Sequence, residues 1–312
     1  MSLASPRRVV YTAVMGRYEQ LNEQAVAAGS NIDFVCFTDD RELVSSTWTV
    51  RFIEPRFPLD SVRSARFLKV RGPSLLADYE ESLWIDNAVQ LRVPPEKILD
   101  AWLADTDLAM PKHSFRTSVL GEFDAVVTSG FDDPARVFEQ LIHYSTLQAG
   151  VLSEVPYWTA ILARRHVPAV DEAMQMWWEH LLRYSRRDQL SINFVIEALQ
   201  VRATGVELDN HDSELHQWPV RVSRKWEVTE DRMANALRIP SVEIGRLENM
   251  LHTAFAQLEL ERAQVDRTNS ALEMVKEELK DARDEADSYT RRLSWRLTSP
   301  FRTLHRLLRG QR

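Results

Sequence analysis

The sequence contains little cysteine and no long apolar run. Its single cysteine, Cys36, excludes an internal disulfide and a cysteine-rich zinc site, so we do not expect a disulfide-stabilised secreted protein. No apolar stretch approaches the roughly 20 residues that span a membrane. The first ten residues, MSLASPRRVV, lack the apolar core of a signal peptide. These absences predict a cytoplasmic protein.

Acidic residues are missing from the end of the chain. Residues 291–312 contain seven arginines and no Asp or Glu; the whole chain has a net charge of −7, so removing these seven charges leaves −14 for the rest. The overall composition, with 44% hydrophobic and 9% aromatic residues, is ordinary for a folded globular protein. An acidic body with a basic tail indicates that the tail meets an anionic surface.

The first two thirds of the chain alternate strand-like and helix-like segments. VVYTAVMG, DFVCFTDD and WTVRFIE have the β-branched and aromatic residues of strands, and residues 61–79 have the pattern of a helix. Further strand candidates are FDAVVTS and WTAILARR, and further amphipathic helix candidates are DEAMQMWWEHLLRYS and DQLSINFVIEALQ. This order predicts an α/β sheet in one domain over residues 1–225, followed by a linker over 226–240.

The segment SLWIDNAVQL places two polar residues inside an apolar run. Its first residues are typical of a strand that is covered on both faces, and Asp86 and Asn87 then follow side by side. An unpaired carboxylate among apolar residues costs several kcal/mol. Asp86 therefore either ends the strand at a surface, where backbone amides satisfy it, or it binds a ligand.

After Pro240 the pattern becomes a heptad repeat. One position of the repeat is occupied by Ile244, Leu251, Leu258, Val265, Leu272, Leu279, Ala286 and Leu293, and the other by Leu247, Ala254, Glu261, Thr268, Val275, Ala282 and Tyr289. Such a stripe has no core of its own and needs a partner helix. We predict a coiled coil over 241–293 and a homo-oligomer that forms through residues 244–293. A long helix that folds back on the body is the alternative.

Residues 294–312 form a basic tail in which we expect Pro300 to break the helix. Beyond it, one helix face carries Phe301, Leu304, Leu307 and Leu308, and the rest carries Arg302, Arg306 and Arg309. This pattern predicts a short helix that lies on an anionic membrane, which would make the protein peripheral on the inner face of the plasma membrane. A solvated tail is the alternative. The acidic body and the lack of a base-reading module argue against nucleic acid as a partner.

Several motifs along the first 200 residues together carry a family resemblance. In order they are YTAVMGRYEQL, DFVCFTDD, RSARFLKV, SLWIDNAVQL, KHSFRTSVLGE and SRRDQLSINFVI. Over residues 8–200 the chain resembles the DUF616 group of glycosyltransferase-like domains, also called the TOD1/MUCI70 group. The tail SWRLTSPFR is similar to the ends of many bacterial enzymes that build surface polysaccharides. The resemblance implies a GT-A-like, Rossmann-type fold that transfers a sugar from a nucleotide-sugar donor to a glycan acceptor, which in that setting is a lipid-linked glycan.

This resemblance implies a role for Asp86. In open α/β sheets ligands bind at the carboxyl ends of strands, and GT-A enzymes commonly hold a divalent metal there with the motif Asp-x-Asp. This chain reads Asp86-Asn87-Ala88, so the second carboxylate is missing. Asp86 could bind Mn²⁺ or Mg²⁺ together with a late histidine, His211 or His216, or it could hydrogen-bond the donor alongside Asn87.

Cations offer a second way to hold the donor diphosphate. Arg63, Arg66 and Lys69 are spaced by three residues on one helix face, and the resemblance favours Arg66 and Lys69 as donor-binding residues. A solvated basic face is the alternative. Thr12 on the first strand and Asp39 after the second are expected on the nucleotide side of the sheet. Asp39 is also typical of a turn that binds no ligand.

The remaining candidate site residues follow from the later motifs of the resemblance. His113 is expected to contact an acceptor hydroxyl or a donor phosphate as a catalytic residue, and Arg116 to bind the acceptor. Asp188 is expected to face the reaction centre, where it deprotonates the acceptor or stabilises an oxocarbenium-like state, with Arg187 orienting it or binding phosphate. Capping of the following helix is the alternative for Asp188. Trp158 is expected to stack on an acceptor sugar.

Two other functions remain open from the sequence. A catalytically silent glycosyltransferase-like module that scaffolds polysaccharide enzymes fits the incomplete Asp86-Asn87-Ala88 motif. A nucleotide-sugar hydrolase would release sugar without an acceptor. The identities of donor and acceptor depend on loop geometry that residue spacing does not encode.

Overall fold

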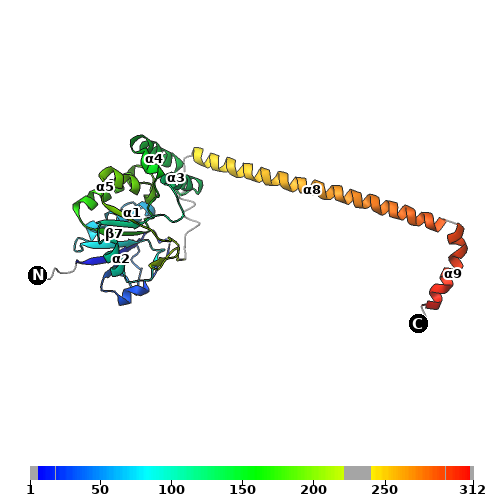
Figure 1. The fold of residues 1–312 in the computed structure, drawn as a ribbon, viewed down its shortest axis with the longest axis horizontal. Coiled ribbons are helices and arrows are strands. Elements are labelled where there is room, and N and C mark those ends of the chain that lie inside the picture. The colour runs from blue at the N-terminus through cyan, green and yellow to red at the C-terminus, as the bar shows by residue number, and fades with distance from the viewer. Residues whose placement is uncertain (1–5, 18, 221–239, 292, 310–312) are drawn as a thin grey trace. The chain divides into compact units, whose positions relative to one another are not determined.

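The computed structural model describes residues 6–17, 19–220, 240–291 and 293–309 (Figure 1). The chain divides into two compact units: Met1–Val242, which holds a β-sheet, and Glu243–Arg312, which is helical where it is described. Nearly all of the linker expected over 226–240 lies outside the described residues.

The first unit is built on a seven-stranded sheet with the strand order β3-β2-β1-β4-β7-β6-β8. Its strands are β1 (Arg8–Val14), β2 (Asp33–Thr38), β3 (Thr49–Phe52), β4 (Glu81–Ile85), β6 (Leu108–Pro111), β7 (Ile161–Arg165) and β8 (Ala203–Val206). β3, β2, β1 and β4 run parallel, β7 is antiparallel to both β4 and β6, and β6 is parallel to β8. A separate two-stranded sheet pairs β5 (Gln90–Leu91) with β9 (His216–Gln217).

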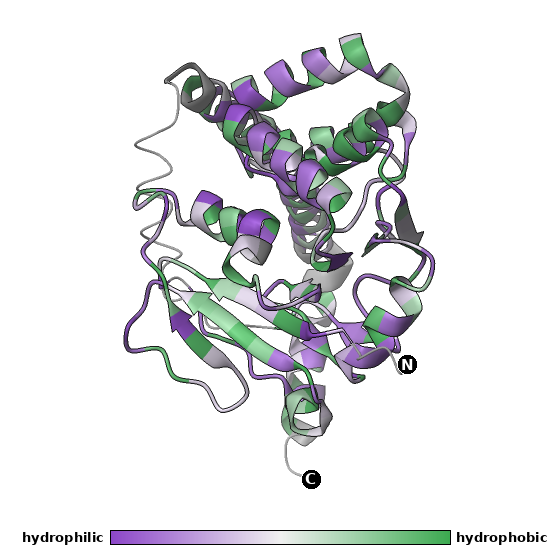
Figure 2. Cartoon of the chain, turned by 90° about the vertical axis from the view of Figure 1, so that its left-hand side faces the viewer, coloured by the Kyte–Doolittle hydropathy of each residue, from purple (hydrophilic) through white to green (hydrophobic). Residues whose placement is uncertain are grey.

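Helices cover both faces of the sheet. α1 (Ser61–Arg71) and α5 (Pro168–Arg183) share one core cluster with the sheet, and α2 (Pro95–Trp102) shares the cluster on the other face. A third cluster joins α3 (Val119–Thr128), α4 (Pro134–Leu147) and α6 (Ile192–Leu199). Figure 2 shows the central strands mainly in the hydrophobic colour, while the helices are banded. Short 3₁₀ segments are η1 (Ala25–Gly29), η2 (Gly72–Leu75), η3 (Ala149–Ser153) and η4 (Asp188–Leu190).

The end of β4 positions the polar residues that the sequence singled out. All five residues of β4 are buried because the sheet is covered on both faces. β4 ends at Ile85, so Asp86 is the first residue beyond the strand, at the edge where the parallel strands β1 and β2 also end. Beside this edge, Cys36 of β2 is fully buried, and burial raises the pKa of its thiol to about 12.

Most of the expected elements are present. The helix expected over residues 61–79 is shorter, because α1 ends at Arg71 and η2 follows it, and two other expectations are wrong. The strand expected for FDAVVTS is part of α3, which begins where the Ser118 hydroxyl accepts a hydrogen bond from the Gly121 N–H (3.0 Å). The break expected at Pro300 is also absent, because Pro300 lies inside α9 (Leu293–Arg309). A proline removes only one backbone hydrogen bond from a helix, and α9 continues through it.

The second unit consists of two helices in its described part, α8 (Pro240–Arg291) and α9. The large apolar residues of the heptad stripe on α8 are each 51–61% exposed: Ile244, Leu247, Leu251, Leu258, Val265, Leu272, Val275 and Leu279. None of the described helices is both long enough and apolar enough to cross a bilayer. Within the described part of this unit, no other element covers the stripe.

Candidate active site

A buried ion pair lies at the centre of the site. Lys69, near the end of α1, is 0% exposed, and its Nζ lies 2.5 Å from Oδ2 of Asp188, which is 2% exposed. Nζ also donates to Oγ1 of Thr159 (3.1 Å) and Oδ1 of Asp86 (3.3 Å). An ammonium group has three hydrogens, and these three acceptors use them all. Lys69 thus joins α1 to the end of β4 and to η4, and it is not placed to bind a donor phosphate as the sequence predicted.

Asp86 is held on one side and partly open. Its Oδ1 accepts a hydrogen bond from Nε1 of Trp84 (2.7 Å) in addition to the one from Lys69, and Nη1 of Arg66 lies 3.9 Å away. The backbone N–H of Asp86 donates to the carbonyl of Ala160 (2.8 Å), which fixes the turn after β4 against the segment before β7. Asp86 ends the strand, and side chains satisfy it in place of the expected backbone amides. Its side chain keeps 29% of its surface exposed, and its binding of a ligand stays a prediction.

The charge of Asp188 is strongly stabilised. Burial alone would raise the pKa of its carboxyl, but the charges of Arg66, Lys69 and Arg187 and the hydrogen bond from Lys69 outweigh burial and hold the pKa well below its usual range. Nε of Arg66 lies 3.3 Å from Oδ1, and Thr159 Oγ1 donates to Oδ2 (2.9 Å). Both oxygens are therefore occupied. Asp188 does not cap a helix through its side chain, and it is poorly suited to the role of a base that we expected.

Arg187 has donors that the protein does not use. Its guanidinium makes no hydrogen bond with any described residue, and its buried Nε lacks a partner there. Its carbon Cζ lies 5.0 Å from the ring centroid of Phe131, which holds the planar group in place. Burial, and then the charge of Arg66, lower the pKa of Arg187, while Asp188 and other carboxylates raise it. A half-buried cation with open donors is a site for an anion.

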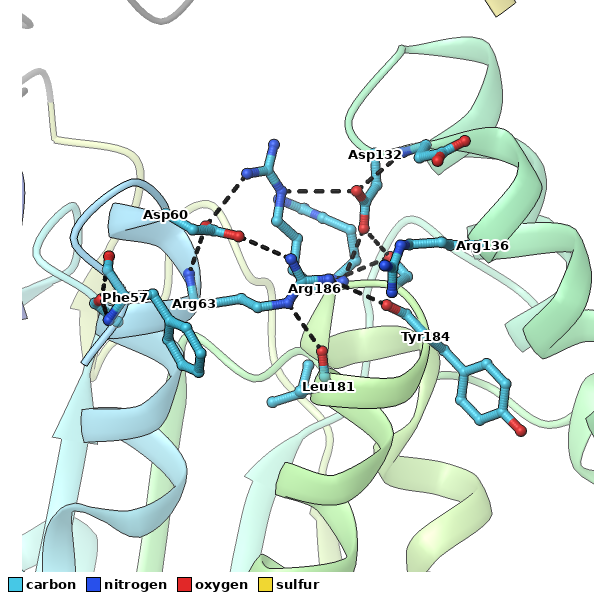
Figure 3. A network of polar contacts seen from close by, with 12 residues as sticks. Phe57, Asp60, Arg63, Asp132, Arg136, Leu181, Tyr184 and Arg186 are labelled. Atoms are coloured by element: carbon cyan, nitrogen blue, oxygen red, sulfur yellow. Dashed lines mark hydrogen bonds and ion pairs between the residues drawn. The ribbon is translucent and has the colours of Figure 1, made fainter. Parts of the chain in front are cut away.

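The segment that carries Arg187 and Asp188 is anchored by a polar network (Figure 3). Oδ2 of Asp132 accepts hydrogen bonds from Ser185 Oγ (2.6 Å) and from the N–H of Arg186 (2.7 Å). The Arg186 side chain also reaches Asp60, the residue that caps α1, at 3.4 Å. Arg63 donates to carbonyls of this same region and pairs with Asp60 (2.8 Å), so its task is structural. α1 and the 185–188 segment are therefore held as one piece.

The last turn of α1 is fixed from the opposite side. Arg164 of β7 is 0% exposed, and its guanidinium donates to the carbonyls of Val70 (3.0 Å) and Lys69 (2.5 Å). The Tyr11 hydroxyl also donates to the Lys69 carbonyl (2.8 Å). The final carbonyls of a helix lack partners within it and carry a partial negative charge. Arg164 and Tyr11 satisfy them and so fix the position from which the Lys69 side chain starts.

A second polar cluster lies at the start of α3. Glu122, which is 5% exposed, accepts a hydrogen bond from Nε of Arg116 at Oε2 (3.1 Å), and Nε2 of His113 lies 4.0 Å from the same oxygen. Burial, and then the charges of Arg116 and His211, lower the pKa of His113 to about 4, so its ring is neutral at pH 7. His113 packs edge-on against Phe115 (4.2 Å between ring centroids), on which His211 stacks (4.8 Å).

The family of the chain follows from comparison with known sequences. Residues 39–213, more than half of the chain, match the family described as TOD1/MUCI70, glycosyltransferase-like domain. The chain belongs to this family. Both polar clusters of this TOD1/MUCI70 domain lie within the matched residues, whereas Thr12 precedes the matched range.

Individual relatives are more distant. The probable hexosyltransferase MUCI70 of Arabidopsis thaliana is 29% identical over 153 residues, which are 46% of this chain and 26% of the plant protein, so the match spans about a quarter of that relative's length. The apo structure of the bifunctional glycosyltransferase WbbM aligns with 13% identity and a TM-score of 0.38, over 66% of this chain and 39% of the other. Mouse xyloside xylosyltransferase 1, also in its apo form, aligns with 10% identity and a TM-score of 0.36, over 64% of this chain and 84% of the mouse chain. At these TM-scores neither likeness carries an argument, and the family match is what identifies the domain.

Three residues expected to bind donor or acceptor are structural in the TOD1/MUCI70 domain. Thr12 is fully buried in the middle of β1, out of reach of a ligand. Asn87 is 6% exposed; its Oδ1 accepts from the N–H of Asn22 and its Nδ2 donates to the Gln20 carbonyl, both at 2.8 Å, so it fastens a loop. Trp158 is 2% exposed in the core cluster that also contains α2.

Asp39 lies at the carboxyl end of β2, where the sequence placed it. Both of its carboxylate oxygens accept from the N–H of Gly16, at 2.9 and 3.1 Å. Gly16 has φ +76°, and a Cβ there would come within 2.7 Å of the Cβ of Ser61, so only glycine fits this turn. Asp39 thereby secures the turn after β1 beside the start of α1, and its contact with a nucleotide stays a prediction.

The residues expected to bind a metal do not fit a divalent cation. Oδ1 of Asp86 already accepts from Trp84 and Lys69, and positive side chains surround it. Both ring nitrogens of His216 are occupied, Nε2 by the Asn210 carbonyl (2.9 Å) and Nδ1 by Ser213 Oγ (2.8 Å). Within the described ranges no three His, Cys, Asp or Glu side chains gather as a metal site would require. His211 lies in the Phe115 stack beside His113.

Sequence reasoning missed Thr159, Glu122, Asp132 and Arg164. Thr159 precedes β7, and its neighbourhood with Asp86 depends on the antiparallel pairing of β4 with β7, in which Ile85 faces Ile161. The clearest available signal was Glu122, a carboxylate four residues after the Ser118 cap in the same KHSFRTSVLGE motif that supplied His113 and Arg116.

Proposed function

We propose that this glycosyltransferase-like domain transfers a hexose from a nucleotide-sugar to a glycan acceptor. The observation that supports the proposal is the cluster of cations beyond β4. The charges of Arg66, Lys69 and Arg187 all act on the Asp188 carboxylate. Lys69 is fully used by Asp86, Thr159 and Asp188, whereas the buried Nε of Arg187 has no hydrogen-bond partner in the described part of the chain. Arginine binds the oxygens of a diphosphate through paired, charge-assisted hydrogen bonds.

The chemistry of sugar transfer explains why such cations are useful. When the bond between the anomeric carbon and the phosphate breaks, negative charge builds on the leaving nucleoside diphosphate. Preorganised positive groups at that position stabilise the transition state more than the ground state. We assign this role to Arg187 and Arg66, and we assign binding of donor hydroxyls to the open side of Asp86. Since the carboxylate set does not fit a divalent metal, the proposed donor site works through arginine.

Titration calorimetry with nucleoside diphosphates and nucleotide-sugars tests this proposal. Each ligand is measured in MnCl₂ and in EDTA. We expect at least one nucleotide-sugar to bind in EDTA, and we expect the diphosphate to bind more tightly than the free nucleoside. At 100 times its Kd a ligand stabilises the fold by about 2.7 kcal/mol, so thermal unfolding gives a second readout. If no member of the panel produces heat or a thermal shift, the function is not sugar transfer.

The main rival is a silent module that recruits polysaccharide enzymes. The commitment of both Asp188 oxygens to protein groups favours it over an enzyme that uses Asp188 directly. Complementation of a deletion strain by the Arg187→Ala variant, which lacks the proposed donor-binding group, with normal surface glycan, would support the scaffold. Loss of the glycan together with a folded variant would support the transferase.

We also propose that α8 forms a homo-oligomeric coiled coil. Its open apolar stripe supports this, since an isolated amphipathic helix of this length gains stability from a partner helix. The Leu258→Glu variant is expected to dissociate, because it places a charge in the stripe, and light scattering will report the mass of one chain. Leu260→Glu is the matched control: Leu260 is 70% exposed, lies off the stripe and receives the same charge. Unchanged mass for Leu258→Glu would contradict the coiled coil.

We further propose that α9 binds the anionic inner surface of the plasma membrane, which would place the acceptor, a lipid-linked glycan of bacterial surface polysaccharide assembly, within reach. Its residues include no Asp or Glu, and Leu297, Phe301, Leu304 and Leu307 are 59–74% exposed. The helical period sets Arg306 opposite this apolar face.

Binding to liposomes that contain anionic lipid tests the proposal for α9. Leu304→Glu is expected to weaken co-sedimentation about tenfold or more, because burying a leucine is worth about 1.5–3 kcal/mol. Thr303→Glu introduces the same charge on a different side of α9 and is expected to change binding much less. Equal losses in the two variants would mean that only the net charge matters and that the helix does not insert its apolar face.

A further inference from the structure

Glu122 lies beside the donor cluster but is not part of it. It belongs to the first turn of α3, and α3 packs against η4, which begins with Asp188. The charges of Arg187 and Asp188 both act on the pKa of Glu122, so the two clusters share one electrostatic environment. A group bound between Arg187 and Glu122 would therefore contact both.

The two oxygens of Glu122 have different surroundings. Oε2 takes the hydrogen bond from Arg116 and faces His113, whereas Oε1 has no polar contact with a described residue. Nearby, Nδ1 of His113 is buried and has no hydrogen-bond partner in the described part of the chain. A buried polar atom without a partner is rare, and a bound ligand or water commonly completes it. One carboxylate oxygen and one imidazole nitrogen are thus available at this place.

The transferase reaction needs a proton acceptor, and Asp188 cannot easily supply it. Both Asp188 oxygens are paired with cations or hydroxyl donors, which makes the group a weak base. We infer that Glu122 is the catalytic base for the acceptor hydroxyl, with Arg116 and His113 as positioning residues. This inference rests on the proposed transfer from a nucleotide-sugar.

The step balances without any further reactant. Oε1 of Glu122 takes the proton of the acceptor hydroxyl, and the acceptor oxygen forms a bond to the anomeric carbon of the donor. The bond from that carbon to the diphosphate oxygen breaks, and its electron pair leaves with the nucleoside diphosphate. Arg187 and Arg66 stabilise the negative charge of this leaving group. Arg116 holds the Glu122 carboxylate in position while Glu122 gains and then loses the proton.

The surroundings of Glu122 make it a stronger base than an ordinary carboxylate. Burial and the charge of Asp188 raise the pKa of the Glu122 carboxyl. The charges of Arg187 and Arg116 and the hydrogen bond from Arg116 lower it. Burial has the largest effect, so the net result is a pKa above the ordinary 4.5. His113 is neutral at pH 7 and adds no charge. The base must be deprotonated to act, so activity is expected to rise with pH through a value above 4.5.

The Glu122→Gln variant of the full chain tests the inference. Turnover is followed with the nucleotide-sugar that binds the wild type, by transfer to a panel of mono- and oligosaccharides and by release of free sugar into water. We expect kcat to fall about 10²- to 10⁴-fold, the acidic limb of the kcat–pH profile to disappear, and donor affinity measured by calorimetry to stay within about threefold. Glu122→Asp is expected to recover part of kcat and to restore the acidic limb. Glu139→Gln makes the same replacement of a carboxylate by an amide at an exposed position of α4. It is the matched control and is expected to leave kcat unchanged.

The outcomes separate this inference from the proposed function. If the wild type binds and turns over a nucleotide-sugar while Glu122→Gln keeps kcat within threefold, or keeps the acidic limb, Glu122 is not the base and the function survives. A Glu122→Gln variant that loses donor affinity and thermal stability to the same extent as activity would assign Glu122 a structural role only. If the wild type binds no nucleotide-sugar, the proposed function fails and the inference fails with it.

Discussion

Replacement of Lys69 by methionine is expected to lower the free energy of unfolding by about 3–5 kcal/mol. The substitution removes the ammonium from a site where Lys69 is 0% exposed, and it leaves the charge of Asp188, at 2% exposed, with Arg66, Thr159 and the charge of Arg187. Breaking a buried pair on one side costs more than the pair contributes, because the remaining charge is not solvated. Chemical denaturation at pH 7 measures the change.

The pH dependence of stability gives the same prediction a second readout. The folded-state pKa of Asp188 lies below the ordinary 3.8, so this group stabilises the fold above that value and loses its contribution as pH falls below it. In Lys69→Met this acid-sensitive part is expected to shrink, because one of the charges that lower the pKa of Asp188, together with its hydrogen bond, is gone. The Lys69→Met/Asp188→Leu double variant removes both charges and is expected to recover much of the loss.

Lys97→Met, on the exposed side of α2, is the control, and its free energy of unfolding should stay within about 0.5 kcal/mol of the wild type. A loss below about 1 kcal/mol in Lys69→Met would show that the pair is not a buried anchor.

The Arg187→Ala variant is expected to bind nucleoside diphosphate about 10- to 100-fold more weakly than the wild type. Hydrogen bonds to a charged group contribute about 1.5–3 kcal/mol each, and the Arg187 guanidinium makes none with the described residues that would compensate for their loss. Calorimetry in EDTA measures the affinity, and the binding of free nucleoside, which carries no phosphate, is expected to change little.

Two further variants make the Arg187 experiment specific. Arg187→Lys retains the charge but not the paired donors, so it is expected to recover only part of the affinity. Arg183→Ala removes an arginine whose side chain is 60% exposed and pairs with Glu139, and it should bind as the wild type does. Equal binding by Arg187→Ala and the wild type would place the diphosphate elsewhere in the domain.

The sequence predicted the fold class and part of the site for a physical reason. Side chains that directly follow parallel strands meet at one edge, so a polar residue after an apolar run locates that edge, as Asp86 does. Helical spacing placed Arg66 and Lys69 on one face of α1, and the SRRDQLS motif supplied Asp188; the structure brings these together with Asp86. Each of these signals is local in the sequence.

The rest of the site depends on pairings that spacing does not encode. Thr159 reaches Lys69 across 90 positions of the chain, and Asp132 reaches Ser185 across 53. The β-branched FDAVVTS segment resembles a strand, yet its apolar side chains are also spaced to face one side of α3, and tertiary packing selects the helix. The expected donor role of Lys69 was wrong because sequence alone does not show how many acceptors surround an ammonium group.

The burial of Cys36 also determines how this chain can be probed chemically. Only the thiolate reacts with maleimides and iodoacetamides, and a fully buried thiol with a pKa of about 12 presents almost none of it at neutral pH. Since the chain has no other cysteine, a cysteine introduced at an exposed position of α8 or α9 would be the one site that a reagent labels. Spin or fluorescent labels attached there would report helix pairing between copies, or immersion in lipid, on an otherwise native sequence.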